Sequence, residues 1–435
     1  MKTYEFGKKF YELRKAKNLT QKELASMLNL TNKAISKWEN GDALPSVTQV
    51  VALAKIFNTT TDELLNNNVK TDKQIYKIAI TGGPCAGKST ALSWLQDAFT
   101  KKGYMVLFVP ETPTELMLGG ISYQTMGSAL DFQASIVKLQ YEKEKLYMEA
   151  AEKMKNHNKV LVICDRGILD GKAYCSNYEF NQILQKLNLN EVSVRDSYDA
   201  VFHLVTAAKG AEEFYTLANN KARFENAEEA RIADNKTLNA WVGHPHLRVI
   251  DNSTDFEHKM IRLINEISSI LNEPKHYEIE RKFLIAYPNL EALEKNASCQ
   301  KVEIIQTYLR PQVDAEMRIR QRGQNGFYTY TKTIKQKVSA MKRVETETRI
   351  TQAEYVNLLL EADPNLNPIR KTRYCLTYKN QYFEIDVYPF WKDKAIMEIE
   401  LRDEQQKIDF PKYINIIKEV TNDEEFLNYN LAKHK

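Results

Sequence analysis

Ten consecutive residues, TGGPCAGKST at positions 81–90, fit the pattern G-x-x-x-x-G-K-[ST]. Gly82 and Gly87 bracket four residues, and Lys88 and Ser89 follow. In such a turn, successive backbone N–H groups converge on a phosphate, and the next helix adds the partial positive charge of its N-terminus. Lys88 would supply a point charge for the terminal phosphates, and the Ser89 hydroxyl is a ligand for Mg²⁺. The alternative is a glycine turn that only connects a strand to a helix.

The elements that must position this loop are also visible in the sequence. An apolar run at 75–80 precedes the loop and a helical pattern at 91–99 follows it, which is the order that a phosphate-binding loop requires. We therefore expect ATP or GTP as the ligand. The residues expected to contact it are Gly82, Gly83, Pro84, Cys85, Ala86, Gly87, Lys88, Ser89 and Thr90.

Two carboxylates come directly after later apolar runs. Glu111 follows the run that begins at 105, and Asp165 follows the run at 160–164; further runs lie at 200–205 and 247–250. Apolar runs that alternate with helical stretches predict a doubly wound parallel sheet, whose ligands gather at the carboxyl ends of the strands. At that edge either carboxylate is placed to hold Mg²⁺ or to activate a nucleophile. The alternative is that each only caps the next helix.

The tripeptide Asp165-Arg166-Gly167 resembles the Asp-Arg motif of deoxynucleoside and thymidylate kinases. The resemblance implies catalytic roles for Lys88, Asp165 and Arg166, with Glu111 in the place of the general base. Residues 131–133 are similar to the base-reading glutamine segment of those kinases, and residues 222–231 resemble a mobile lid. Residues 244–252 resemble the end of the kinase domain in the NadR-like group. For the histidines at 244 and 246 we favour a structural loop over metal ligation, because no partner spacing accompanies them.

The N-terminal residues predict a small helical module. Amphipathic helices are expected at 6–17, 21–28, 32–38 and 47–57, with capping residues Thr20 and Thr31, and a short turn at 61–65. Residues 1–70 hold 11 Lys and Arg against 7 Asp and Glu, which accounts for the whole net charge of +4. A basic module on a neutral body indicates an end that faces nucleic acid.

This module closely resembles the Xre/Cro family of helix-turn-helix domains. The resemblance implies DNA as a partner, with Gln21 near a DNA phosphate. The residues implied to face the major groove are Thr31, Asn32, Lys33, Ser36 and Lys37. The alternative is a helical bundle used for protein contacts or dimerisation, which leaves a homodimer as a partner.

Beyond residue 276 the pattern changes to a period of two, with charged residues on one side of successive strands. Carboxylates come in i, i+2 pairs, such as Glu398 and Glu400, and their repulsion is costly unless cations lie between them. A closed barrel lined with both signs would hold Mg²⁺ or Mn²⁺ on the acids and an anionic chain on the bases. The alternative is an ordinary sheet with one face in water.

The sequence EIERK at 278–282 resembles the E-x-E-x-K signature of the CYTH, or triphosphate tunnel metalloenzyme, family, and the resemblance covers 276–435. Family members hydrolyse inorganic triphosphate or nucleoside and RNA triphosphates, or cyclise ATP. The resemblance implies catalytic roles for Glu278 and Glu280. The implied metal ligands are Glu278, Glu280, Glu345, Glu347, Asp386, Glu398 and Glu400, and the implied phosphate ligands are Lys282, Arg318, Arg320, Lys332, Arg343 and Arg373. At 370–373, RKTR, more than one residue competes for one basic role. A barrel that only binds phosphate ligands is the alternative.

Length and composition agree with this division. A chain of 435 residues suggests about three domains, and 43% apolar with 27% charged residues is ordinary for globular protein. The five cysteines are scattered without a C-x-x-C pair, which indicates neither a zinc site nor a disulfide framework. We expect a cytoplasmic protein without a membrane span, because no apolar run approaches ~20 residues and positions 1–3 do not open a signal peptide.

The predicted fold class is multidomain: an all-α helix-turn-helix at 1–66, a linker at 67–73, an α/β doubly wound domain at 74–272 and an antiparallel β-barrel at 276–435. The last two domains together resemble the TRPL translocation defect family of animals, and NadR-like proteins join a helix-turn-helix to a kinase. Three functions stay open. One is an enzyme acting on nucleoside triphosphates or inorganic polyphosphate, one is a nucleotide-sensing transcription regulator, and one is a nucleoside-type kinase.

Overall fold

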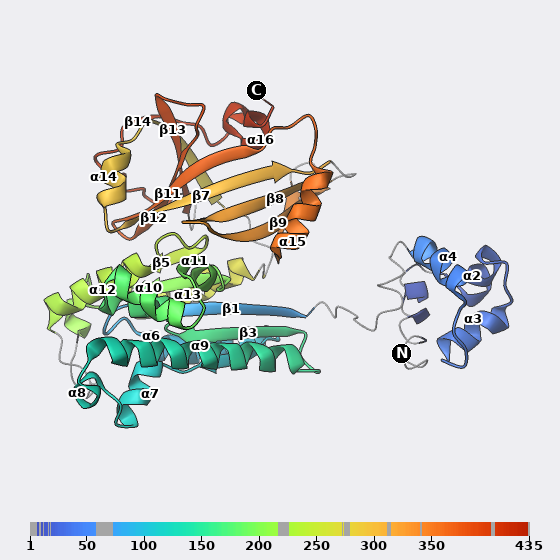
Figure 1. Cartoon of the computed structure of the whole chain (residues 1–435), viewed down its shortest axis with the longest axis horizontal. Helices are drawn as coiled ribbons and strands as arrows, with labels where there is room; N and C mark the ends of the chain where they lie inside the picture. Colours follow the sequence, from blue (N-terminus) through green and yellow to red (C-terminus); the bar gives the residue numbers. More distant parts are fainter. Residues whose placement is uncertain are drawn as a thin grey trace. The chain divides into compact units, whose positions relative to one another are not determined.

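The computed structural model describes most of the chain (Figure 1). The described residues are 7, 10, 11, 13–15, 17, 19–57, 73–215, 226–271, 273, 279–310, 315–339, 342–401 and 405–433, without the side chains at 47, 55, 214, 315, 336–339 and 342–345. They separate into two compact units, Met1–Gln74 and Ile75–Lys435.

The first unit is helical. It contains α2 (Gln21–Met27), α3 (Asn32–Glu39) and α4 (Val47–Phe57), and residues 10, 11 and 13–15 are also helical. Thr20 and Glu23 form the predicted capping box, and Thr31 caps α3 by accepting from the Ala34 amide. The core includes Phe10, Leu24, Ile35, Trp38, Leu53 and Phe57. The three helices confirm the prediction, while residue 6 and the turn at 61–65 lie outside the described residues.

The second unit begins with a parallel sheet. Its strands are β1 (Gln74–Thr81), β2 (Met105–Val109), β3 (Lys159–Asp165), β4 (Ala200–Leu204) and β5 (Leu247–Ile250), in the order β2-β3-β1-β4-β5. The pairings of β1 with β4, β2 with β3 and β4 with β5 are parallel. This sheet confirms the predicted doubly wound architecture and places the ends of β1 and β3 next to each other.

Helices cover both faces of the parallel sheet, because alternate strand residues point to opposite sides. The helices are α6 (Lys88–Lys101), α7 (Thr112–Leu118), α8 (Tyr123–Met126), α9 (Ala129–Lys153), η1 (Ile168–Tyr174), α10 (Asn177–Lys186), α11 (Glu191–Arg195), η2 (Glu212–Phe214), α12 (Ala227–Trp241) and α13 (Phe256–Ile270). Ile78 and Ile80 pack in a core with α6 and α13. Ala79, between them, packs in a second core with α9, α10 and α12.

The rest of the second unit is a nine-stranded antiparallel sheet in the order β10-β9-β8-β7-β11-β12-β13-β6-β14. Its elements are β6 (Ile279–Ala286), α14 (Leu290–Lys295), β7 (Cys299–Tyr308), β8 (Ala315–Gln324), β9 (Phe327–Ser339), β10 (Lys342–Ile350), α15 (Gln352–Leu358), η3 (Leu359–Glu361), β11 (Ile369–Tyr378), β12 (Gln381–Val387), β13 (Lys394–Leu401), β14 (Ile416–Glu419), η4 (Glu424–Phe426) and α16 (Asn428–Leu431). Residues of β10 and of β6 line one cavity although many strands separate them, so the sheet curls around that cavity.

The two sheets share a core and a buried ion-pair cluster. Val302 and Ile304 of β7 belong to the same apolar cluster as Trp241 of α12. Asp196 lies at the centre of the ion pairs, 2.7 Å from Arg195 Nε and 3.2 Å from Arg322 Nη1. Burial alone would raise the pKa of Asp196, but the two guanidinium groups hold it well below its ordinary value. The second unit is therefore one compact body.

We expect Asp196→Ala to lower the free energy of unfolding by about 3–5 kcal/mol, because it leaves Arg195 and Arg322 buried without a counter-charge. The measurement is urea unfolding of the full chain, followed by tryptophan fluorescence. Asp409→Ala, which removes an exposed pair with Lys379, is the control and should change stability by less than about 0.5 kcal/mol. An equally small effect of Asp196→Ala would contradict a stabilising role of the cluster.

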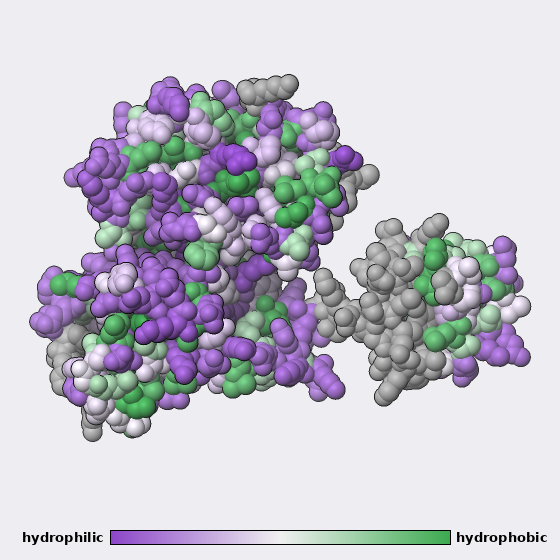
Figure 2. Space-filling model, in the orientation of Figure 1, coloured by the Kyte–Doolittle hydropathy of each residue, from purple (hydrophilic) through white to green (hydrophobic). Residues whose placement is uncertain are grey.

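The surface visible in Figure 2 is mainly hydrophilic, with scattered apolar residues. Large exposed apolar side chains such as Leu118 and Leu360 are ordinary on folded proteins when they are scattered. Within the described part of the chain, every helix is too short or too polar to cross a membrane.

Candidate functional site

The loop after β1 has the backbone geometry of an anion-binding turn. A Cβ at Gly82 would lie 2.1 Å from the carbonyl oxygen of Leu204, so only glycine fits there. Gly87 has φ of 86° and is the N-cap of α6, and Cys85 also has a positive φ of 54°. The chain thus turns tightly into a helix N-terminus, where backbone amides and the helix dipole favour a phosphate.

Lys88 is folded back onto this loop. Its ammonium group donates to the carbonyl oxygens of Gly82 and Gly83, at 3.0 Å each. Burial, together with the nearby Arg166 guanidinium, lowers the pKa of Lys88 to about 8. The two carbonyls that accept from this ammonium group are neutral, and Asp165 and Glu111 lie nearby. An anionic hydrogen-bond partner would bind the ammonium group more strongly, and a nucleotide phosphate is such a partner.

The two predicted carboxylates at the strand ends have different surroundings. Glu111 accepts from Arg166 Nε at 2.6 Å; although burial favours its neutral form, the guanidinium and the Thr114 hydroxyl lower its pKa to about 2. Burial raises the pKa of Asp165, and its Oδ1 is buried without a hydrogen-bond partner in the described structure. Asp165 and the exposed Ser89 hydroxyl therefore fit Mg²⁺, which prefers oxygen ligands.

Asp234 of α12 holds the loop from behind. Its carboxylate is fully buried and accepts from the amide of Gly83 at 2.9 Å and from the amide of Thr206 at 3.1 Å. Lys209 Nζ lies 2.7 Å away and His203 Nε2 lies 3.1 Å away. The sequence analysis missed Asp234, because a carboxylate within an amphipathic helix looks like a solvated residue.

The loop opens into a cavity of about 1320 Å³. Besides the loop, Glu111, Asp165 and Arg166, the cavity is lined by Phe132 and Gln133 of α9. The volume therefore extends beyond the phosphate cradle toward a largely apolar wall of α9 that carries the amides of Gln133 and Gln140. The predicted lid at 222–231 is described only from residue 226 onward.

A second cavity, of about 590 Å³, lies inside the curled antiparallel sheet. Strand register brings carboxylates together on its wall: Glu384 stands opposite Glu398, and Glu400 stands opposite Glu280. Like charges directly opposite each other are destabilising. The sheet thus carries a row of acids across β12, β13 and β6 that needs cations.

Basic residues face these acids. Lys282 Nζ lies 2.7 Å from Glu398 Oε1, and Arg373 Nη2 lies 2.9 Å from Glu398 Oε2. Burial and the neighbouring Glu398 raise the pKa of Glu280 to about 7, even though Lys282 is 3.2 Å away. The acid row is therefore only partly neutralised by the protein's own cations.

Arg320 of β8 lines this cavity and stands opposite Thr331 of β9. The Nε of Arg320 and the Oγ1 of Thr331 are both buried without a hydrogen-bond partner in the described structure. Arg320 also pairs with Glu347, at 3.8 Å from Nη1, so its Nε is the part of the guanidinium that a ligand accepting hydrogen bonds would satisfy. A phosphate chain is such a ligand.

Within the described residues, no three His, Cys, Asp or Glu side chains form a ready metal site. Glu278 lies outside the described residues. The donor chemistry still fits a hard divalent cation, because Glu280, Glu398 and Glu400 offer carboxylate oxygens and Glu280 has a raised pKa.

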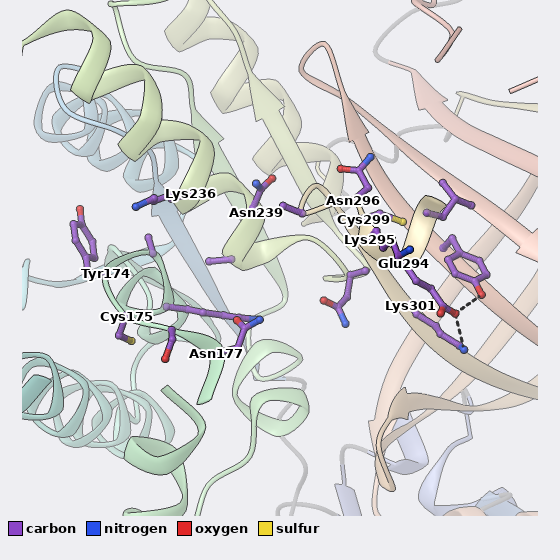
Figure 3. Close-up of a pocket in the computed structure, with 18 residues that line it drawn as sticks. Tyr174, Cys175, Asn177, Lys236, Asn239, Glu294, Lys295, Asn296, Cys299 and Lys301 are labelled. Atoms are coloured by element: carbon purple, nitrogen blue, oxygen red, sulfur yellow. Dashed lines mark hydrogen bonds and ion pairs between the residues drawn. The ribbon is translucent and has the colours of Figure 1, made fainter. Parts of the chain in front are cut away.

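A third cavity, of about 870 Å³, lies between η1 and α14 (Figure 3). Its lysines include Lys301, which is 2.9 Å from Glu294. Burial raises the pKa of Cys175 to about 11 and of Cys299 to about 12, so both thiols stay protonated at neutral pH. Lys172 and Lys295 are paired as well, with Glu191 and Glu291. A polar cavity with such ion pairs and protonated thiols is typical of a solvated groove.

Comparison with known families decides the domain assignment. A helix-turn-helix family matches residues 10–64, an AAA domain family matches 77–259 and the CYTH domain family matches 276–425. The chain therefore joins a helix-turn-helix domain, an AAA domain and a CYTH domain. The three resemblances read from the sequence are confirmed at this level.

Individual relatives cover single domains. Over 62 residues the chain is 45% identical to the HTH-type transcriptional activator BcrR of Enterococcus faecalis, which is 14% of this chain and 30% of BcrR. The crystal structure of the inorganic triphosphatase NE1496 is 28% identical and covers 37% of this chain and 97% of that one, with a TM-score of 0.27. The controller protein C.AhdI from Aeromonas hydrophila is 30% identical over 14% of this chain and 96% of its own, with a TM-score of 0.14. These TM-scores are low, so the function of each site rests on its own residues.

Most residues predicted for the CYTH site face its cavity. Those that line it are Glu280, Lys282, Arg318, Arg320, Glu347, Arg373, Glu398 and Glu400. Asp386 is buried beside them, paired with Lys371 and with Arg373 at 2.6 Å. The side chains of Arg343 and Glu345 lie outside the described residues, so those two predictions stay open.

Lys332 lies on the other face of β9 from the cavity. It stands opposite Ile319, whereas Arg320 and Arg318 stand opposite threonines 331 and 333. Lys335, three residues later, has the parity of those threonines and lines the cavity. At 370–373, Lys371 and Arg373 both line the cavity and Arg370 is exposed, so two residues remain candidates for the one basic role.

The residues predicted to read DNA divide into two groups. Asn32, Lys33 and Lys37 are exposed on α3. Thr31 is the N-cap of that helix, Ser36 is half-buried, and Gln21 Nε2 donates to Glu39 Oε2 at 2.6 Å. The exposed basic residues of α3 are therefore Lys33 and Lys37, four residues apart on one face of the helix.

Proposed function

We propose that the CYTH domain is a metal-dependent phosphohydrolase that cleaves inorganic triphosphate or nucleoside triphosphates. The observation that carries this proposal is one cavity whose wall combines the acid row with Arg320, a cation whose Nε is buried without a hydrogen-bond partner in the described structure. A neutral ligand would not pair with the basic residues of the cavity, and a cation bound alone would be repelled by them. A polyanion bound together with a divalent cation matches both sides.

The residues of this cavity have separate tasks in the proposal. Arg318, Arg320 and Arg373 bind and align the phosphate chain, with Lys282 between the acids and the anion. Glu280, Glu398 and Glu400 would hold Mg²⁺ or Mn²⁺, together with Glu278. When bound, such an ion polarises phosphoryl oxygens and lowers the pKa of a bound water. The curled sheet encloses the chain and limits access of bulk water.

A screen of inorganic triphosphate, longer polyphosphate, ATP and GTP for phosphate release, with and without Mg²⁺ or Mn²⁺, tests the proposal. We expect metal-dependent release from at least one of these substrates. Absence of release from all of them, with the chain folded, would leave a cavity that only binds phosphate ligands.

The AAA domain would bind ATP or GTP with Mg²⁺ through the loop at 82–90, Asp165 and Lys88. A second activity, phosphate transfer to a nucleoside-like acceptor, is favoured by one observation. The cavity continues past the phosphate cradle to Phe132 and Gln133, which leaves room for an acceptor. Glu111 with a pKa of about 2 is a weak base in this state, so the kinase remains the second candidate.

The helix-turn-helix domain would bind DNA, and the nucleotide or polyphosphate bound by the other domains would regulate that binding. The segment 251–253 supports a link between the two phosphate sites, because Ser253 lines both cavities. A nucleotide-sensing regulator whose CYTH domain only binds phosphate is the alternative.

We expect Lys33→Ala and Lys37→Ala together to weaken DNA binding at all sequences. The slope of log affinity against log salt concentration should fall by about the value expected for two phosphate contacts. The measurement is the affinity for a mixed-sequence duplex across a salt series. Lys22→Ala, an exposed lysine of α2, serves as the comparison. Salt-independent binding, or none by the unaltered chain, would remove DNA as a partner.

A further inference from the structure

The wall of the CYTH cavity is not built by the CYTH domain alone. His246 and Arg248, at the start of β5 in the AAA domain, line the same cavity as Glu280 and Arg320. Both domains belong to one compact unit. One end of the proposed triphosphate site is therefore made of AAA residues.

Arg248 is the cation on this AAA wall. Its Nη2 lies 2.5 Å from Glu400 Oε2 of β13, its Nε lies 3.5 Å from Glu266 Oε2 of α13, and its Nη1 donates to the carbonyl oxygen of Leu247. The Arg248 side chain is 14% exposed and that of Glu400 is 36% exposed. Glu400 thus has two charged neighbours. Glu280 stands opposite it on the neighbouring strand, and Arg248 pairs with it across the domain boundary.

The charge balance at this end of the cavity depends on Arg248. Glu398 pairs with two CYTH cations, Lys282 and Arg373, whereas Glu400 pairs with Arg248 of the AAA domain. A guanidinium has five N–H donors in a planar fork, two on each Nη and one on Nε. In Arg248 the contacts with Glu400, Glu266 and the Leu247 carbonyl are made through three different nitrogens, and each Nη carries a second N–H. The guanidinium can therefore hold Glu400 and a phosphate oxygen together, with bidentate geometry that a lysine cannot reproduce.

We propose that Arg248 is a substrate-binding residue of the CYTH site, and that it holds the phosphate chain from the AAA side while Arg318, Arg320 and Arg373 hold it from the sheet. The triphosphate site is then complete only when both domains are present. This inference rests on the proposed triphosphatase function. It assigns a substrate-binding residue that lies in the AAA domain and not in the CYTH domain.

The test compares Arg248→Gln and Arg248→Lys in the full chain, with inorganic triphosphate as the probe. Calorimetry without added metal gives the dissociation constant, and phosphate release with Mg²⁺ gives kcat and KM. We expect Arg248→Gln to raise the dissociation constant and KM about 10- to 100-fold, with a smaller effect on kcat. Arg248→Lys should recover part of the affinity, because it restores the charge without the fork.

Arg281→Gln is the matched control. Arg281 forms an exposed ion pair with Glu419, at 2.5 Å, elsewhere on the same domain, so its loss should leave affinity and KM unchanged. If Arg248 only joins the two domains, Arg248→Gln will lower the unfolding temperature and kcat while the dissociation constant stays at the wild-type value. That result overturns the inference.

The failure of this inference is distinguishable from failure of the proposed function. If the wild-type chain binds triphosphate but releases no phosphate, the proposed hydrolase activity is refuted. A larger dissociation constant for Arg248→Gln would still support the inference in that case. A wild-type chain that releases phosphate, with an unchanged dissociation constant in Arg248→Gln, refutes the inference alone. A wild-type chain that does not bind triphosphate refutes both.

Discussion

Replacement of Glu280 and Glu398 together by glutamine is expected to lower phosphate release from inorganic triphosphate at least about 100-fold, or about 2.7 kcal/mol in the barrier. Both residues belong to the acid row, and glutamine keeps their size while removing the charge that a divalent cation requires. Release is measured as initial rates of free phosphate at saturating Mg²⁺ or Mn²⁺.

For triphosphate binding without metal, we expect the opposite effect in the same double variant. Glu398 pairs with Lys282 at 2.7 Å and with Arg373 at 2.9 Å. The double variant therefore removes both carboxylate partners of Lys282 and one of the three carboxylates that pair with Arg373. Triphosphate affinity in a chelator should then be unchanged or higher. Glu303→Gln, an exposed residue of β7, is the control for both measurements. Normal release by the double variant would exclude the acid row from the chemistry.

Lys88→Ala is expected to weaken ATP or GTP binding by about 1.5–3 kcal/mol, which is about 10- to 100-fold, because it removes a charge-assisted contact to the phosphates. The lysine is buried against the carbonyls of Gly82 and Gly83, so the nucleotide would replace neutral partners by charged ones. Nucleotide affinity is measured by calorimetry with Mg²⁺ present.

Lys101→Ala separates this effect from a general change in charge. Lys101 is exposed in the last turn of α6, the helix that Lys88 begins, and its loss should not alter nucleotide affinity. Equal affinities for the wild-type chain and Lys88→Ala would mean that the loop does not bind the phosphates.

Local features were predictable from the sequence. The turn at 82–87 needs glycine at two positions, and no other residue type satisfies that backbone geometry as cheaply. Thr20 with Glu23 predicted the start of α2, and the alternation of charged and apolar residues with a period of two predicted the antiparallel strands. In each case the physical cause lies within a few residues of the chain.

Features that depend on partners distant in the sequence were missed. Asp234 and Gly83 are 151 positions apart, and an isolated acid in a helical pattern gives no sign of such a contact. Lys335 instead of Lys332 lines the cavity because the pairing of β9 with β8 fixes which face each residue takes, and a one-residue difference changes the face. Glu384 shows the same alternation as its neighbours, and only the register opposite Glu398 gives it a place in the acid row.

The union of the AAA and CYTH parts was likewise invisible in the sequence. Asp196, Arg322 and Arg248 look like solvated surface charges there. In the structure Arg322 crosses to Asp196, and Arg248 crosses to Glu400. Charges that pair between domains have the same local pattern as charges that face water, so separate domains were the natural prediction.

Phosphate release from inorganic triphosphate by three full-length proteins tests the central claim most directly. With Mg²⁺ or Mn²⁺, the wild-type chain and Lys88→Ala should release phosphate at similar rates, and the Glu280→Gln, Glu398→Gln variant should release almost none. Release that disappears in Lys88→Ala and persists in the glutamate variant would place the hydrolysis in the AAA domain and contradict the account.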